Sequence, residues 1–226
     1  MGLFITVEGS DYTGKTSTVI PGLQIAIINK GLPVLVSREP GGTIQGEHIR
    51  QQIFEKKAAG ASAFELAVLF NQARAIHLNE KIIPFLGKKK EKRAIVILDR
   101  YLDSTRVYQG YEGGVAMKEI FALEKKHIHD YLPDLTLILY FPKEVFLSEL
   151  KKRLSDDRQR NSWDKDSYKF QLKRQQYYLK LPKLAQIRKE NRNFLLINAA
   201  QPKVKVVKDC INGCQPFIYQ NFAVNI

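Results

Sequence analysis

The fold of this chain is decided by the stretch Val7-Glu8-Gly9-Ser10-Asp11-Tyr12-Thr13-Gly14-Lys15-Thr16-Ser17. Its spacing, G-x-x-x-x-G-K-T, is that of a P-loop, in which two glycines let successive backbone N–H groups turn toward phosphate oxygens. The apolar run 3–7 before it predicts a buried strand, and residues 15–29 after it predict a helix whose positive end faces the same phosphates. We expect Lys15 to reach the β and γ phosphates of a nucleotide and the Thr16 hydroxyl to bind Mg²⁺.

Length and composition are those of one α/β domain with a sizeable core: 226 residues, 44% of them apolar. No apolar run approaches the ~20 residues of a membrane helix. A cleaved signal peptide would remove the first strand, so we expect no signal peptide and a cytoplasmic location.

The net charge of +13 admits two interpretations, a nucleic-acid binder or a basic surface that serves anionic nucleotides. Basic residues are spread along the chain, with short runs such as Lys88-Lys89-Lys90, and no nucleic-acid-binding signature accompanies them. We therefore expect small phosphorylated ligands and neither a specific nucleic acid nor a membrane as partner. Cys210 and Cys214 have the spacing of a metal or redox pair, but no His or further Cys accompanies them, which favours ordinary thiols on a terminal helix or turn.

Apolar strands alternate with longer amphipathic stretches along the whole chain. The expected strands are 3–7, 34–37, 94–98, 135–141 and 194–197, and the expected helices are 15–29, 44–57, 63–85, 117–129, 143–154, 166–191 and 203–212. This alternation predicts an α/β fold in one domain, 1–226, with a five-stranded, mostly parallel sheet and helices on both faces. Ligands of such sheets bind at the carboxyl ends of the strands.

Two further motifs fall at those ends. Arg38-Glu39-Pro40-Gly41-Gly42-Thr43 follows the second strand, where Pro and Gly favour a turn and an arginine can clamp a phosphate. Asp99-Arg100-Tyr101, then Ser104-Thr105 and Tyr108-Gln109-Gly110, follow the third. Asp99 ends a buried strand, where an acid near Mg²⁺ is expected, and Arg100 is a second candidate phosphate ligand. Residues 154–166 are charged and poor in apolar side chains, which fits either a mobile lid or a solvated connector.

Together these motifs resemble the thymidylate kinase family: R-E-P-G-G-T, D-R-Y-x-x-S and Y-Q-G stand behind an E-G-x-D-x-x-G-K-T P-loop. The resemblance runs from residue 3 to about 202. It implies a P-loop NTPase fold with three layers, and transfer of the γ-phosphoryl group of ATP to dTMP with Mg²⁺, giving dTDP for dTTP biosynthesis. It also implies a homodimer formed through helices near 44–57 and 63–85.

The resemblance also implies roles at the acceptor site. Arg38 and Arg100 match the arginines that hold the acceptor phosphate, Glu39 matches the acid beside them, and Pro40 is expected to be cis. Asp11 is similar to the ligand of the sugar 3′-hydroxyl.

A second group matches the residues that recognise the base. Phe70 and Arg74, one helical turn apart, resemble the ring that stacks on thymine and the donor to its exocyclic oxygen. Ser104 and Gln109 resemble the pair that reads the pyrimidine edge, and Tyr108 the ring that excludes a 2′-hydroxyl. For an isolated Phe, core packing would be the alternative.

At the donor site the whole P-loop from Gly9 to Ser17 is expected to bind ATP, together with Arg153 and Asn198, and Asp99 to reach Mg²⁺ through water. One branch of the family carries an arginine in the P-loop where this chain has Tyr12. That departure indicates the bacterial branch, whose arginines come from the lid, so 154–166 is expected to be that lid. The candidate arginines are Arg153, at the end of the preceding helix, and Arg158 and Arg160 in the lid.

Ser162 stands where the family often has a lid arginine, which predicts weaker transition-state stabilisation unless Arg158 or Arg160 takes over. Asn198 replaces a usual Asp, and the tail 213–226 has no assignment. Two other functions remain open at this stage. One is a P-loop kinase for a different nucleoside monophosphate, and the other is a catalytically weakened nucleotide-binding homologue.

Overall fold

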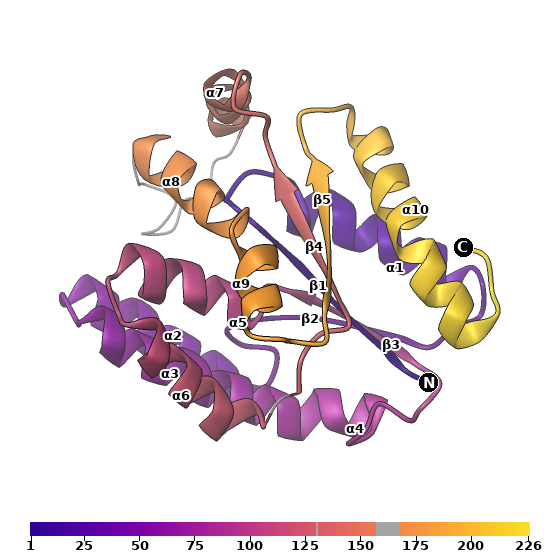
Figure 1. Cartoon of the computed structure of the whole chain (residues 1–226), viewed down its shortest axis with the longest axis horizontal. Helices are drawn as coiled ribbons and strands as arrows, with labels where there is room; N and C mark the ends of the chain where they lie inside the picture. Colours follow the sequence, from indigo (N-terminus) through magenta and orange to yellow (C-terminus); the bar gives the residue numbers. More distant parts are fainter. Residues whose placement is uncertain (130, 157–167) are drawn as a thin grey trace.

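The computed structural model describes residues 1–129, 131–156 and 168–226, with the backbone alone for 154–156. Five parallel strands form one sheet in the order β2-β3-β1-β4-β5, and helices cover both of its faces (Figure 1). The strands are β1 (Leu3–Gly9), β2 (Val34–Arg38), β3 (Ile95–Asp99), β4 (Leu135–Tyr140) and β5 (Asn193–Asn198). The predicted α/β fold class is confirmed, and the ends of the five predicted strands differ from these by at most two residues.

The helical segments are η1 (Lys15–Val19), α1 (Ile20–Ile28), α2 (Ile44–Ala58), α3 (Ala63–His77), η2 (Leu78–Ile82), α4 (Ile83–Leu86), α5 (Leu102–Thr105), η3 (Arg106–Glu112), α6 (Met117–Ile128), α7 (Phe146–Asp156), α8 (Tyr168–Tyr178), α9 (Leu181–Ile187) and α10 (Lys203–Phe222), where η marks a π-helical turn. Within the described residues, no helix combines the length and apolarity needed to cross a membrane.

Side chains of β1 alternate between two cores because successive residues of a strand point to opposite faces. Leu3, Ile5 and Val7 pack with α1 and α10 on one face. Phe4 points to the other face, where its ring meets that of Tyr101 with 5.1 Å between centroids. The sheet is therefore the middle layer of three.

The C-terminal helix corrects the prediction that a helix ends at 212 and an unassigned tail follows. α10 continues to Phe222, with Pro216 inside it. Its buried side chains recur every four residues, at Val206, Cys210, Cys214, Ile218 and Phe222, and pack into the core. This continuous apolar stripe offsets the ~3 kcal/mol that an internal proline costs a helix. Both cysteines are free thiols on this helix, as predicted, and the described residues hold no cluster of three or more His, Cys, Asp or Glu suited to a metal ion.

Two other helical predictions need correction. The single helix expected over 166–191 is divided into α8 and α9, and Pro182 lies in the first turn of α9, where its missing N–H is tolerated. α5 and η3, the helical segment that carries Ser104 and Tyr108, were not predicted from the sequence. The long helix expected over 63–85 is continuous, but it runs through the π-helical turn η2 ahead of Pro84.

Strand register brings the three motifs together. Val7 of β1 and Arg38 of β2 both lie opposite Asp99 of β3. Because all strands run in the same direction, the P-loop and the segments that follow Arg38 and Asp99 leave the sheet at one edge.

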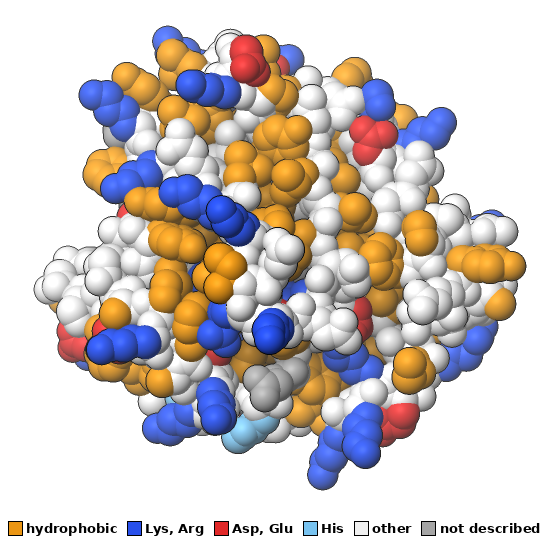
Figure 2. Space-filling model, in the orientation of Figure 1, with side chains coloured by type: hydrophobic (Ala, Val, Ile, Leu, Met, Phe, Trp, Pro, Cys, Tyr) orange, Lys and Arg blue, Asp and Glu red, His pale blue; other side chains and the backbone are white. Residues whose placement is uncertain are grey.

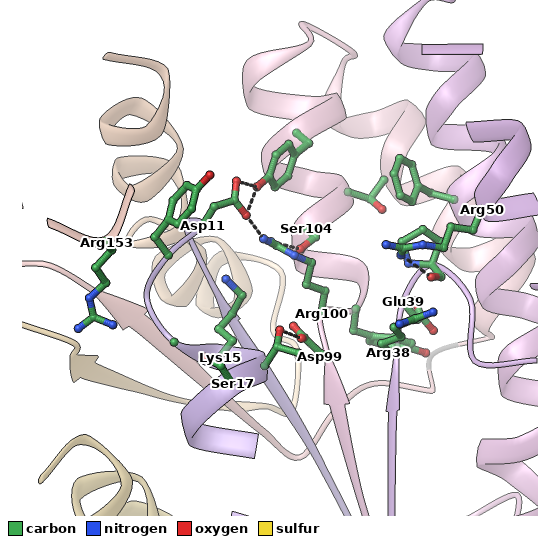
Figure 3. Close-up of a pocket in the computed structure, with 18 of the residues that line it drawn as sticks. Asp11, Lys15, Ser17, Arg38, Glu39, Arg50, Asp99, Arg100, Ser104 and Arg153 are labelled. Carbon is green, nitrogen blue, oxygen red and sulfur yellow. Dashed lines mark hydrogen bonds and ion pairs between the residues drawn. The ribbon is translucent and has the colours of Figure 1, made fainter. Parts of the chain in front are cut away.

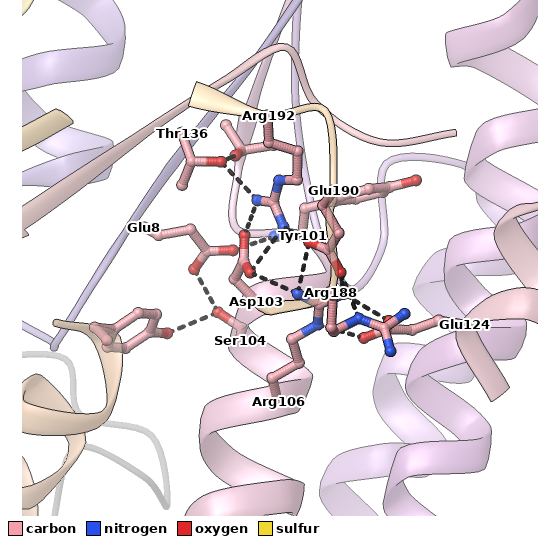
Figure 4. A network of polar contacts seen from close by, with 12 residues as sticks. Glu8, Tyr101, Asp103, Ser104, Arg106, Glu124, Thr136, Arg188, Glu190 and Arg192 are labelled. Carbon is pink, nitrogen blue, oxygen red and sulfur yellow. Dashed lines mark hydrogen bonds and ion pairs between the residues drawn. The ribbon is translucent and has the colours of Figure 1, made fainter. Parts of the chain in front are cut away.

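A buried network of charged side chains lies between the sheet and the helical segments α5, η3 and α6 (Figure 4). Arg106 of η3 donates to Glu124 of α6 at 2.7–2.8 Å and to Glu190 at 2.7–3.1 Å. Arg192 donates to Asp103 of α5 and to Thr136 of β4. The network fixes α5 and η3 to the sheet through bonds that residues far apart in sequence supply.

Candidate active site

One cavity of about 920 Å³ lies at the carboxyl edge of the sheet. Figure 3 shows Arg153 at one end, Arg38, Glu39 and Arg50 at the other, and Lys15 with Arg100 between them. Its size is at the upper end of the range for small-molecule sites.

The P-loop forms the floor of the Arg153 end. Gly9 and Gly14 have φ of 133° and 86°, and a Cβ on Gly9 would lie 2.3 Å from the carbonyl oxygen of Leu139, so only glycine fits there. The side chain of Lys15 folds back into this loop, and its Nζ donates to the carbonyl oxygens of Ser10 at 2.7 Å and Gly9 at 3.1 Å.

Lys15 is a buried cation with altered acidity. Burial lowers its pKa to about 8, and the neighbouring Arg100 acts in the same direction, against the attraction of Asp11, Asp99 and Glu8. A phosphate that replaced the carbonyl oxygens of Gly9 and Ser10 as the partner of Lys15 would raise the pKa of Lys15 again, because it is an anion.

Thr16 and Asp99 place two oxygen ligands side by side at the P-loop. The Thr16 hydroxyl donates to Asp99 Oδ2, and both residues line the cavity. A hydroxyl and a carboxylate are the donor types that Mg²⁺ prefers, so these residues fit that ion.

Arg38 and Arg50 supply positive charge at the opposite end. Arg38 Nη2 donates to both carboxylate oxygens of Glu47, at 3.1 and 3.2 Å, and its side chain is 57% exposed. Arg50 Nη1 donates to the carbonyl oxygen of Pro40 at 2.9 Å, and the Glu39–Pro40 bond is cis, as expected. Sequence analysis missed Arg50, although its place three residues after Glu47 on α2 puts both on one helix face.

Phe70 and Arg74 of α3 both line the cavity. The Arg74 side chain is only 1% exposed. Its Nε donates to Glu39 Oε2 at 2.7 Å, and its Nη2 to the Tyr101 carbonyl and the Thr105 hydroxyl. Arg74 is thus fixed by protein bonds before any ligand arrives.

Arg100 lies at the centre of the cavity, with the positive φ of 68° that non-glycine residues seldom adopt. Its Nη2 donates to Asp11 Oδ1 at 2.5 Å, and its Nη1 to the Tyr178 hydroxyl at 2.7 Å and to Ser104 Oγ at 3.1 Å. Ser104 donates its hydroxyl hydrogen to Glu8 at 2.7 Å. Toward a bound nucleobase, the Ser104 oxygen can therefore act only as a hydrogen-bond acceptor.

Asp11 forms the wall beside Tyr108, whose hydroxyl donates to Asp11 Oδ2 at 3.3 Å. Burial alone would raise the pKa of Asp11, but the charges of Arg100, Lys15 and Arg174 outweigh it and hold the pKa below its usual value. Asp11 is therefore an anionic acceptor. Gln109, from the same segment as Tyr108, is buried and lines the cavity too.

The remaining donor-site candidates divide into two groups. Arg153 donates to the carbonyl of Ala199 at 2.9 Å and lies over the ring of Phe141, and Tyr12 and Ser17 also line the cavity. Asn198 does not line it; its Oδ1 accepts the N–H of Ala200. Gln201 and Lys203, which sequence analysis missed, line this wall instead.

Gly14, Lys15 and Thr16 line the cavity, whereas Gly9, Ser10 and Thr13 do not. The expected lid residues Arg158, Arg160 and Ser162 lie outside the described residues.

Comparison with known proteins places most of this chain in one family. The family model described as thymidylate kinase matches residues 7–211. A thymidylate kinase of Clostridium novyi (strain NT) is 34% identical over 208 residues, which are 92% of this chain and 96% of the relative. Those of Bacillus velezensis (strain DSM 23117 / BGSC 10A6 / LMG 26770 / FZB42) and Thermoanaerobacter pseudethanolicus (strain ATCC 33223 / 39E) are 35% and 33% identical, over 93% and 96% of this chain and 93% and 99% of the relatives. The chain belongs to the thymidylate kinase family.

Proposed function

We propose that this protein transfers the γ-phosphoryl group of ATP to dTMP in the presence of Mg²⁺, giving dTDP and ADP in dTTP biosynthesis. The observation that carries the proposal is one cavity lined by the P-loop Lys15 and by five arginines, of which Arg38, Arg50 and Arg100 are the candidates for the acceptor phosphate. Two anionic groups can therefore meet head to head in it. Family membership supplies the identity of the acceptor.

The donor nucleotide binds along the P-loop. Lys15 exchanges its two carbonyl partners for the β and γ phosphates, and the loop amides and the helix that begins at Lys15 add donors and positive potential. Thr16 and Asp99 are the residues that would hold Mg²⁺, Asp99 through water, and the ion would supply positive charge beside the donor phosphates.

The acceptor phosphate binds between Arg38 and Arg100, with Arg50 beside them. Arg38 is paired with Glu47 and more than half exposed, so a dianionic phosphate can replace that carboxylate at little desolvation cost. A phosphate monoester is already anionic near neutral pH, so transfer needs positioning and charge stabilisation and no general base.

Base and sugar extend from that phosphate toward α3 and η3. Phe70 stacks on thymine, and Arg74, Gln109 and Ser104 contact its polar edge. Asp11 receives the sugar 3′-hydroxyl, and Tyr108 crowds the 2′ position, which favours deoxyribose.

Arginines at the lid supply further positive charge around the transferred phosphoryl group. Arg153 lines the cavity, and its Nη1 lies 3.5 Å from the point that a Cβ on Gly14 would occupy. Arg158 and Arg160 are proposed for the same role. They belong to the expected lid, 154–166, whose first three residues are the end of α7 and whose remainder lies outside the described residues. Either Arg158 or Arg160 compensates for Ser162, or the transition-state charge is stabilised less well. Closure excludes the water that would hydrolyse ATP.

We also propose a cytoplasmic homodimer that pairs through α2 and α3. Two large apolar side chains at the start of these helices are exposed, Ile44 by 84% and Phe64 by 44%. Light scattering coupled to gel filtration tests the dimer. A single species with the mass of one chain, 25.9 kDa, would contradict it.

The function is tested with purified protein, ATP and Mg²⁺ against dTMP, dUMP, dCMP, dGMP and thymidine, with chromatographic detection of the diphosphate. We expect dTDP as the dominant product. No dTDP above background, or faster turnover of another monophosphate, would overturn the proposal. Binding to DNA that weakens steeply with salt, without turnover, would favour the nucleotide-binding homologue.

A further inference from the structure

Arg174 of α8 is a charged side chain with only 1% of its surface exposed. Its Nε and Nη2 donate to the two carboxylate oxygens of Glu112, at 2.5 and 2.7 Å. Its Nη1 lies 3.9 Å from Asp11 Oδ2, and its guanidinium carbon lies 4.7 Å from the centre of the Tyr108 ring. One buried cation therefore contacts a structural carboxylate and two groups of the cavity wall.

Three segments of the chain meet at this arginine. Tyr108 and Glu112 are four residues apart on η3, which brings their side chains to one side of that segment. Asp11 comes from the P-loop. On α8, Gln171 precedes Arg174 by three residues and donates to Asp11 Oδ2 at 3.3 Å. The polar face of α8 thus connects η3 to the P-loop.

Among the described residues, Arg174 reaches the cavity through its neighbours. Asp11 and Tyr108 line the cavity, whereas Arg174 and Glu112 do not. Arg100 binds Oδ1 of Asp11 from one side, and Arg174 faces Oδ2 from the other. With a cation at each oxygen, the carboxylate has a fixed plane and retains its negative charge.

We infer that Arg174, held by Glu112, is a positioning residue for the nucleotide sugar: it fixes the Asp11 carboxylate and the Tyr108 ring in the orientation that receives the 3′-hydroxyl. This inference rests on the proposed function, which places the deoxyribose of dTMP against Asp11. It adds a residue that the sequence motifs do not contain.

The test compares dTMP with 2′,3′-dideoxythymidine 5′-monophosphate, which lacks the hydroxyl. Dissociation constants are measured by calorimetry for the wild-type protein and Arg174→Gln, alongside kcat and KM. Because a hydrogen bond to a charged group is at stake, dTMP binding should weaken about tenfold to a hundredfold. Binding of the dideoxy nucleotide should change less than about threefold, and KM for ATP should stay constant.

Lys173→Gln is the matched control, since it removes one positive charge from the neighbouring, exposed position of the same helix. It should leave both dissociation constants unchanged. Arg174→Lys keeps the charge without the paired bonds to Glu112 and should restore part of the preference for the hydroxyl. If Arg174→Gln does not fold because Glu112 is left unpaired, the double variant Glu112→Gln, Arg174→Gln removes both charges and should show the same selective loss.

Equal loss of affinity for the two nucleotides, or no loss for either, would overturn the inference. Arg174 would then have only a structural role. A wild-type protein that binds both nucleotides equally would also overturn it, even with dTMP turnover intact. Failure of the proposed function is recognised separately, in the wild-type protein alone, by the absence of dTDP.

Discussion

Glu8 of β1 accepts the hydroxyl hydrogen of Ser104 at 2.7 Å, from behind the surface of the cavity. Its other carboxylate oxygen accepts the N–H of Tyr101 at 2.7 Å, and Ser104 in turn accepts from Arg100. The Glu8 carboxylate therefore holds Tyr101 and Ser104, which follow Arg100 along the chain. The carboxylate itself has no access to solvent.

This position makes stability depend on pH. Burial raises the pKa of Glu8 from 4.5 to about 7, and the nearby Asp103 adds to the shift. Between these values the folded protein holds a proton that the unfolded chain has released, so this group's contribution to stability falls as pH rises. Glu8→Gln removes the titration. From pH 5 to pH 8 the variant should gain about 1–3 kcal/mol of unfolding free energy relative to wild type, measured by urea denaturation. A difference that is the same at both pH values would contradict the assignment.

Lys15→Ala should abolish phosphoryl transfer while dTMP still binds. The side chain faces the donor end of the cavity and is held by the P-loop carbonyls, so its loss removes charge stabilisation in the transition state. We expect kcat to fall at least about a hundredfold. Calorimetry should give an unchanged dissociation constant for dTMP, and the exposed Lys205→Ala is the control. A normal kcat would refute the donor-site assignment.

The rate should also fall at alkaline pH. With a pKa of about 8 for Lys15 in the free protein, the ammonium is lost above that pH. kcat/KM for ATP, which reports the free enzyme, should then decrease up to about tenfold per pH unit. A profile that is flat from pH 7 to 9.5 would show that Lys15 is not required in its charged form.

Phe70→Ala should raise KM for dTMP by about ten- to a hundredfold, because base stacking on an aromatic ring contributes ~1–3 kcal/mol. Tyr219→Ala, an aromatic side chain of α10 that is 56% exposed, is the control and should leave KM unchanged. If KM for dTMP is unaltered in Phe70→Ala, the ring serves core packing.

Glu124→Gln should destabilise the fold rather than the chemistry. Both Glu124 oxygens accept hydrogen bonds from Arg106, which is almost fully buried. Glu124→Gln leaves the buried Arg106 charge only partly neutralised, by Glu190, and breaking a buried ion pair costs ~3–5 kcal/mol. The urea midpoint should fall accordingly, whereas Asp209→Asn, in an exposed pair with Lys205, should leave it unchanged. Equal midpoints for both variants would contradict this role of the network.

Much of the site was predictable because its signals are local. Leu3–Gly9 and Ile95–Asp99 are short apolar strands, each ending at a residue with phosphate or metal chemistry. The rule that parallel strands present their carboxyl ends at one edge then brings Lys15, Arg38 and Asp99 together without knowledge of the register.

Other parts depend on contacts that no local pattern records. Glu8 looks like one more residue of a buried strand, Arg50 like a surface arginine of α2, and Asn198 like a cavity residue. The extension of α10 past Pro216 follows from packing of Ile218 and Phe222 on the core, whereas propensity alone favours a helix end.

The sequence by itself determined the order of the strands and the P-loop, and it predicted Arg38 and Arg100 as candidate phosphate ligands, because these follow from periodicity and from spacings of a few residues. Only the tertiary structure decided which groups hold those residues in place: Glu39 on Arg74, Glu8 beneath the Arg100 turn, and Glu112 with Arg174 behind Asp11. The physical reason is that burial makes an unpaired charge costly, and its partner comes from whichever element packs nearby, 35 to 96 residues away along the chain.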